Sequence, residues 1–212
     1  MSNSIAYYYD AQVTAVDFNP VAIKMAGETA KLLGTDVNYI CADLFKFEYG
    51  PQDIVISNGV LHHTSDALEG VRKCISLTKR GGKIFIGLYH KYGRKPFLDY
   101  FEELKRTTTD EDYLLEKYLE LDRRHKDKVQ AKSWFLDQVL HPFETQHTLE
   151  EIYHIFQEMD VRLISTSING YGETDDIEKL FALEKKLYYT GVEKLKQHQY
   201  YPGFFYVYGE RK

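Results

Sequence analysis

Apolar and polar residues follow two different periods along the first 90 residues of the chain. Four short apolar runs have the composition of buried strands, and they span residues 12–17, 37–41, 53–57 and 83–89. Between residues 20 and 33, apolar side chains recur every three or four positions, as on one face of a helix that Gly34 ends. The strand runs show little polar alternation, which is typical of strands covered on both faces. This alternation of strands and helices predicts an α/β fold with a parallel sheet.

The pattern changes after Tyr92. Residues 96–140 are rich in charged and aromatic side chains and show no strand signal, so they are expected to be largely helical. Thr148 and Glu151 have the spacing of a capping box at the start of a further helix. Beyond it, the pattern predicts a strand, a helix and a last strand over residues 161–168, 175–196 and 204–208.

Composition narrows the classes of protein to which this chain can belong. Its 212 residues include 43% hydrophobic and 28% charged residues, which indicates one globular domain with additions. A formal net charge of −5 gives no clear signal for nucleic-acid binding. The two cysteines, Cys41 and Cys74, have no metal or redox spacing and suit a reducing compartment. With no membrane-length apolar run and no signal-peptide layout at the start, we expect a cytoplasmic protein without a membrane partner.

Candidate site residues follow the carboxyl ends of the predicted strands, where parallel sheets bind their ligands. Asp17 ends the first run, and Asn19 with Pro20 has the form of a helix N-cap. Asp17 therefore either caps this turn or holds the two hydroxyls of a ribose. Asp43 ends the second run with the same two alternatives, and as a ligand it would accept a hydrogen bond from an adenine amino group.

Several histidines lie near these strand ends. His62 and His63 follow the third run and His90 follows the fourth. Adjacent side chains diverge, so His62 and His63 favour a helix entry beside a cleft over a metal site. A second set that could be drawn as metal ligands, His141, Glu144 and His147, is interrupted by Pro142, which favours a structural or substrate-facing loop. No metal is expected.

Four ordered motifs together resemble the class I S-adenosylmethionine-dependent methyltransferases, in the small-molecule branch that carries a "VLHH" turn. The motifs are "VTAVDFNPVAI", "ADLFKF", "DIVISNGVLHHTSD" and "LTKRGGKIFIGLY", and the terminal "GFFYVYGER" is similar to the family's reversed last strand. The resemblance implies a Rossmann-like sheet of parallel strands with an antiparallel last strand and a helical cap insertion. It also implies S-adenosylmethionine as the cofactor.

The resemblance also implies roles for individual residues. Asp17 would hold the cofactor ribose, Phe18 would pack near the adenine, and Asn19 would lie beside them. Asp43 and Leu44 would bind the edge and the face of the adenine. The methionine part of the cofactor and the mouth of the active site would be flanked by Asn58, Gly59 and Val60.

The chain departs from the family pattern at its start. The first strand and the glycine-rich turn that should precede Asp17 are absent, so the chain begins inside the cofactor motif, as a truncated product, as a natural remnant or with a replacement for the strand. That strand would belong between the strands that end at Asp17 and Ser57, which are still expected to share one sheet. We therefore expect weak cofactor binding by residues 1–212 alone, and self-association into a homo-oligomer through unpaired strands.

The resulting functional hypothesis is methyl transfer to a small-molecule acceptor. Residues 1–92 would form a partial cofactor-binding core, residues 93–147 a helical cap over the substrate, and residues 148–212 the rest of the core with a helical insertion at 173–198. Where the acceptor must lose a proton, the candidates for a general base are His62, His63, Tyr89 and His90, of which His63 or Tyr89 is preferred. Two alternatives stay open: a non-catalytic scaffold that kept the fold, and an oxidoreductase that uses NAD.

Overall fold

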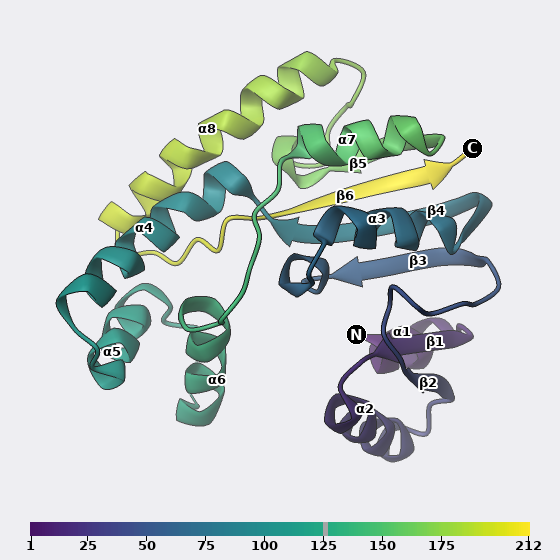
Figure 1. Ribbon diagram of the computed structural model, residues 1–212, viewed down its shortest axis with the longest axis horizontal. Helices are drawn as coiled ribbons and strands as arrows, with labels where there is room; N and C mark the ends of the chain where they lie inside the picture. Colours follow the sequence, from purple (N-terminus) through teal and green to yellow (C-terminus); the bar gives the residue numbers. More distant parts are fainter. Residues whose placement is uncertain (125–126) are drawn as a thin grey trace. The chain divides into compact units, whose positions relative to one another are not determined.

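The computed structural model describes residues 1–124 and 127–212 and divides the chain into two compact units, Met1–Gly50 and Pro51–Lys212 (Figure 1). Each unit contains its own sheet. The first holds strands β1 and β2, and the second holds four strands in the order β3-β4-β6-β5. The three functional segments expected from the sequence do not coincide with these two units and remain a prediction. Their residues are 1–92, 93–147 and 148–212.

The first unit consists of α1 (Ser2–Tyr9), β1 (Val13–Asp17), α2 (Pro20–Leu33) and β2 (Val37–Cys41). The strands β1 and β2 are parallel, and Asp17 lies opposite Cys41. Helix α2 begins as predicted, because the Asn19 side chain accepts hydrogen bonds from the backbone N–H groups of Val21 and Ala22. It ends at Gly34, whose φ of 65° is the left-handed conformation that glycine adopts at low cost.

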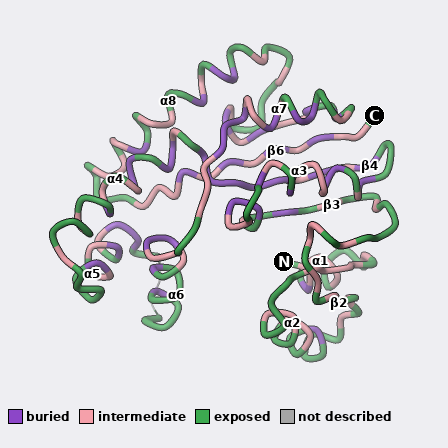
Figure 2. Tube along the Cα trace, in the orientation of Figure 1, coloured by how far each residue is buried: buried purple, intermediate pink, exposed green. Residues whose placement is uncertain are grey.

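A single asparagine ties the first unit together. Asn3 donates from Nδ2 to the carbonyl of Ala26 on α2 at 2.9 Å and accepts from the Tyr39 hydroxyl on β2 at 2.6 Å. Among residues 1–50, only Asn3 and Ala30 are buried (Figure 2). The unit thus has a small core, and much of its cohesion comes from these polar contacts.

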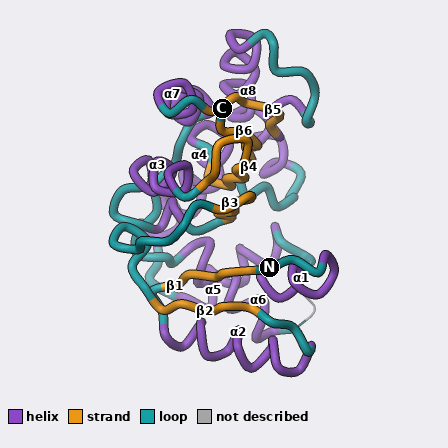
Figure 3. The backbone as a smooth tube through the Cα atoms, turned by 90° about the vertical axis from the view of Figure 1, so that its right-hand side faces the viewer, coloured by secondary structure: helices purple, strands orange, loops and turns teal. Residues whose placement is uncertain are grey.

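The second unit contains β3 (Gln52–Asn58), β4 (Thr78–Tyr89), β5 (Val161–Thr166) and β6 (Phe204–Arg211). Strand β3 is parallel to β4, whereas β6 lies between β4 and β5 and is antiparallel to both (Figure 3). The expected reversal of the last strand is confirmed. Strand β4 starts earlier than predicted, at Thr78, because Gly81, with a φ of 77°, sits in an irregular stretch of the strand rather than in a turn before it.

The helices of the second unit follow the predicted positions closely. Helix α7 has the expected capping box, in which Thr148 and Glu151 bond each other's backbone N–H groups. The described part of the region 93–140 is largely helical, with breaks at 108–110 and 122–124 between the helices, and residues 125–126 lie outside the description. The helical elements are η1 (Leu61–His63), α3 (Ala67–Ser76), α4 (Lys91–Thr107), α5 (Glu111–Leu121), α6 (Lys128–Val139), α7 (Leu149–Glu158), η2 (Ser167–Asn169) and α8 (Ile177–Lys196).

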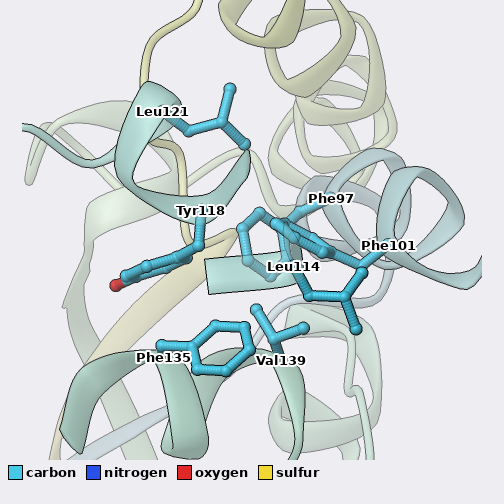
Figure 4. Packing of buried hydrophobic residues seen from close by; sticks show 7 residues of the cluster. All are labelled: Phe97, Phe101, Leu114, Tyr118, Leu121, Phe135 and Val139. Atoms are coloured by element: carbon cyan, nitrogen blue, oxygen red, sulfur yellow. The ribbon is translucent and has the colours of Figure 1, made fainter. Parts of the chain in front are cut away.

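Helices α4, α5 and α6 share an aromatic core of their own. Seven buried side chains meet there, and Figure 4 shows how they face one another: Phe97, Phe101, Leu114, Tyr118, Leu121, Phe135 and Val139. A helical layer with its own core provides a fixed support for residues that project from α4 and α6.

One architectural expectation is wrong. The sequence predicted that residues 13–16 and 54–57 share one sheet, but β1 pairs with β2 and β3 pairs with β4, in two separate sheets. Among the described residues, no strand forms a ladder with the second edge of β1 or of β3. Because no described strand bonds to both, β1 and β3 belong to separate ladders.

Candidate active site

The first unit places two predicted cofactor residues at the same end of a parallel strand pair. Asp17 is the last residue of β1 and Asp43 follows β2, and both side chains are exposed. Asp17 accepts the N–H of Asn19 at 2.8 Å, and Asp43 accepts the N–H of Phe45 at 3.0 Å. Each carboxylate therefore forms a local turn through one oxygen, and Asp17 Oδ2 makes no hydrogen bond within the part of the chain that is described.

The neighbours of these acids differ in their exposure. Phe18 is 80% exposed, so its ring is available for stacking. Leu44 is half-buried. The side-chain oxygen of Asn19 is already used in capping α2, which leaves its amide for any other contact.

The second unit carries the remaining predicted cofactor residues after β3. Gly59 has a φ of 76°, and its N–H donates to the carbonyl of Gly87 on β4 at 3.1 Å. Glycine adopts this left-handed conformation at low cost, which lets the chain turn after β3. Asn58 and Val60 on either side are exposed. Asp17 and Asp43 belong to one unit, and Asn58, Gly59 and Val60 to the other.

The two adjacent histidines of η1 have different environments. His62 is 1% exposed, and its Nδ1 accepts the backbone N–H of Tyr89 at 3.3 Å. Burial, together with the nearby His63 and Arg94, lowers the pKa of His62 to about 2. His62 is therefore a neutral packing residue.

His63 is only half-buried, and one of its ring nitrogens is engaged. Its Nδ1 lies 3.0 Å from the carbonyl oxygen of Phe143. Because a carbonyl can only accept, Nδ1 carries the proton, and Nε2 of the neutral ring is left with a lone pair. Burial lowers the pKa of His63, although the Phe143 carbonyl opposes this shift. The ring is thus neutral near pH 7 and can accept a proton at Nε2.

Tyr89, at the end of β4, is buried beneath these histidines. Its hydroxyl accepts a hydrogen bond from Gln138 Nε2 at 2.7 Å, and the Arg94 guanidinium carbon lies 3.7 Å from the ring centroid. Burial raises the pKa of Tyr89 to about 12. The phenol stays protonated, which suits a hydrogen-bond donor better than a base.

His90 serves the structure of the second unit. Its Nδ1 accepts the N–H of Gly93 and so caps α4, while Nε2 lies 2.9 Å from Oε2 of Glu184 on α8. Both side chains are completely buried. Because both ring nitrogens have partners and the ring is out of contact with solvent, His90 is not suited to be a base.

The segment that contains the possible metal ligands considered from the sequence makes other contacts. Those ligands were His141, Glu144 and His147. Glu144 pairs with Arg94, and Thr145 Oγ1 lies 2.8 Å from Nε2 of His147. Within the described residues, no group of three or more histidines, cysteines or acids could hold a metal ion. Sequence reasoning missed Arg94, Gln138 and Glu184, whose burial depends on partners far along the chain.

Comparisons with known proteins bear on the family that the chain resembles. Residues 1–86 match the family model described as a methyltransferase domain. The Ubiquinone biosynthesis O-methyltransferase of Xanthomonas axonopodis pv. citri is 34% identical over 84 residues, which is 38% of this chain and 35% of that protein. The corresponding enzyme of Caulobacter vibrioides is 34% identical over 82 residues, 37% of this chain and 32% of that protein. The chain thus matches about a third of these relatives' length, and the resemblance to class I methyltransferases is confirmed in that part.

Solved structures agree in fold. PKMT2 from Rickettsia typhi in complex with AdoHcy aligns with a TM-score of 0.67 at 16% identity, over 99% of this chain and 46% of that one. Magnesium protoporphyrin IX methyltransferase from Synechocystis PCC 6803 aligns with a TM-score of 0.55 at 15% identity, over 95% and 64%. The α/β, Rossmann-like fold is confirmed. The described helices include none with the length and apolar character needed to cross a membrane.

Proposed function

Because residues 1–86 match the methyltransferase domain family, we propose that the protein is an S-adenosylmethionine-dependent methyltransferase that acts on a small molecule. The observation that carries this proposal is the set of residues that the match covers. It contains every residue predicted to touch the cofactor, from Asp17 to Val60, and also His63.

In the first unit, the exposed Asp17 carboxylate and the exposed Phe18 ring are chemically suited to the ribose and the adenine of the proposed cofactor. Asp17 would bind the ribose hydroxyls through Oδ2, Phe18 would stack near the adenine, and Asp43 with Leu44 would bind its edge and face. Asn58, Gly59 and Val60 would flank the methionine part. The cofactor would supply a methyl group on a sulfonium, which is already a strong leaving group, so the protein contributes alignment and exclusion of water.

The acceptor is proposed to be a hydroxyl compound. The similar curated proteins are named O-methyltransferases, and a hydroxyl must lose its proton as the bond to the methyl carbon forms. His63 Nε2 would accept that proton, while Tyr89 would hold the acceptor oxygen by donating a hydrogen bond. Residues 93–147 would cover the substrate. A cytoplasmic location and a homo-oligomeric state, both expected from the sequence, belong to this proposal.

Isothermal titration calorimetry with S-adenosylmethionine, S-adenosylhomocysteine and NAD tests the proposal. The expected result is binding of the first two ligands, weak in residues 1–212 alone, without binding of NAD. Binding of NAD would favour the oxidoreductase alternative. If no ligand binds, either to this chain or to one extended by its upstream codons, the protein is a scaffold that kept the fold.

A further inference from the structure

His63 is held by a segment that comes from a distant part of the chain. Residues 141–147, which we call the strap, connect α6 to α7. Phe143 in the strap provides the carbonyl that bonds His63 Nδ1, 80 residues away in sequence. The position of this one oxygen decides which ring nitrogen carries the proton, so whatever fixes the strap also fixes the tautomer.

The strap is bonded to the core on the side that follows Phe143. The N–H of Thr145 donates to the carbonyl of His62 at 2.8 Å, and the N–H of His147 donates to the carbonyl of Tyr89 at 2.9 Å. The N–H of Lys91 returns to the carbonyl of His147 at 2.8 Å. These bonds fix the backbone two residues or more beyond Phe143, but they do not fix Phe143 itself.

Phe143 donates its own N–H to Nδ1 of His141 within the strap, at 3.2 Å, and Arg94 provides the nearest anchor outside the strap. Its Nε and Nη2 donate to the two oxygens of Glu144, the next residue in the strap, at 2.9 and 2.7 Å. The guanidinium also bonds the side-chain and backbone oxygens of Gln138 and the carbonyl of Pro202. All five of its N–H groups therefore have an acceptor.

Burial makes this anchor rigid. The Arg94 side chain is completely buried, and that of Glu144 is 12% exposed. Two parallel charge-assisted bonds fix both the distance and the plane of the carboxylate. An exposed ion pair would not hold its backbone in this way, because water competes for the same groups.

We propose that Arg94 and Glu144 are positioning residues that keep the Phe143 carbonyl against Nδ1 of His63 and thereby present Nε2 as the proton acceptor. The assignment of His63 as the base rests on the proposed function, whereas the control of its tautomer does not. Titratable groups around His63 are contributed by several elements: His62 on η1, Asp137 on α6, and His141 and Glu144 in the strap.

The tautomer can be read directly in residues 1–212. Long-range ¹H–¹⁵N spectra of histidine-labelled protein at pH 7.5 distinguish a proton on Nδ1 from one on Nε2. The proposal expects His63 to carry its proton on Nδ1 in the wild type, and a proton on Nε2 would overturn it.

Glu144→Gln tests the role of the pair, because it removes one charge and one acceptor oxygen while keeping the shape. We expect His63 to lose its single Nδ1–H state and to populate both tautomers. Glu158→Gln is the matched control, since Glu158 makes a similar two-point contact with Arg72 but on the surface. If Glu144→Gln folds and His63 keeps the wild-type tautomer, the proposal is wrong.

A variant that fails to fold is replaced by Glu144→Asp, which keeps the charge and shortens the reach by one methylene. Near-UV circular dichroism identifies the folded variants. Under the proposed function, kcat should fall in Glu144→Gln with KM for the cofactor unchanged, by less than the roughly hundredfold to ten-thousandfold that a general base contributes, because part of His63 keeps the productive tautomer. A tautomer change without any detectable methyl transfer by the wild type would support the positioning role and reject the proposed function.

Discussion

His90 and Glu184 form a completely buried hydrogen bond of 2.9 Å between the start of α4 and the middle of α8. The same Glu184 oxygen accepts the N–H of Leu149 at the start of α7 at 2.7 Å. One carboxylate oxygen therefore joins three helices, and the other has no hydrogen-bond partner among the described residues.

Glu184→Ala should destabilise the protein by roughly 2–6 kcal/mol, because it leaves the His90 Nε2–H and the Leu149 N–H unpaired at about 1–3 kcal/mol each. Urea unfolding measures the change. Glu184→Gln keeps one acceptor oxygen and should cost less. Equal stability of Glu184→Ala and the wild type would show that water enters and replaces the carboxylate.

Asp17→Ala should weaken binding of S-adenosylhomocysteine at least about tenfold, because a charge-assisted hydrogen bond of roughly 1.5–3 kcal/mol is lost. Calorimetry measures the affinity. The control is Asp36→Ala, which removes an exposed acid that precedes β2, at the opposite end of the strand pair. If both variants bind like the wild type, Asp17 is only a turn residue.

His62→Phe should make the protein less sensitive to acid. The pKa of His62 is about 2 in the folded state and near 6.5 when exposed, so between these values the unfolded chain binds one more proton. Stability from this group is complete above pH 6.5 and is lost as the pH falls, by about 1.4 kcal/mol per pH unit well below 6.5.

Unfolding free energies measured between pH 6.5 and 4.5 give this slope. In His62→Phe the slope should be smaller than in the wild type by the contribution of about one proton. The exposed His154→Asn variant controls for the loss of a histidine. An unchanged slope in His62→Phe would mean that His62 is protonated in the folded protein.

The pH dependence of methyl transfer should reflect His63. Because its pKa is lowered from 6.5 by burial, the unprotonated base is present throughout the neutral range. The value of kcat/KM should therefore be level from about pH 7 upwards and fall only on the acid side of pH 6.5. His63→Asn should lower the plateau and abolish the acid limb; an acid limb that persists in this variant belongs to another group.

Gly203→Ala should be strongly destabilising. A Cβ atom there would lie 2.1 Å from the backbone nitrogen of Arg94, and the φ of 60° is itself unfavourable for alanine. We expect a loss of more than about 1 kcal/mol in unfolding free energy. Gly50→Ala, whose added Cβ would meet no atom within 4 Å apart from its chain neighbours, is the control and should change stability by less than about 0.5 kcal/mol.

Local signals were the part of the fold that could be predicted. Asn19 with Pro20 and Thr148 with Glu151 mark helix starts through bonds that span three residues or fewer, so the sequence alone reveals them. The reversed last strand was expected from the family resemblance. That β1 and β3 lie in separate sheets could not be seen, because strand periodicity does not say which strands bond to each other.

The candidate site was predicted only in part. His63 and Tyr89 stood out because they follow strand ends, but the groups that set their chemistry are remote. Arg94 looks like one more charge in a helix until Glu144, 50 residues later, pairs with it. Asn3 likewise reads as an ordinary polar residue, although it links α1 to α2 and β2. Contacts of this kind are set by tertiary packing rather than by local pattern.

The place of β6 in the sheet has a consequence for synthesis. Residues 204–211 come last among the strands, yet they lie between β4 and β5, and β5 pairs with no other strand in the described structure. A ribosome therefore releases β5 before its only partner exists, and the sheet of the second unit can close only after translation has passed Arg211. Until then, the nascent chain leaves uncovered the edges of β4 and β5 that β6 later pairs with, and unpaired edges of this kind are the surfaces that chaperones bind and that aggregate.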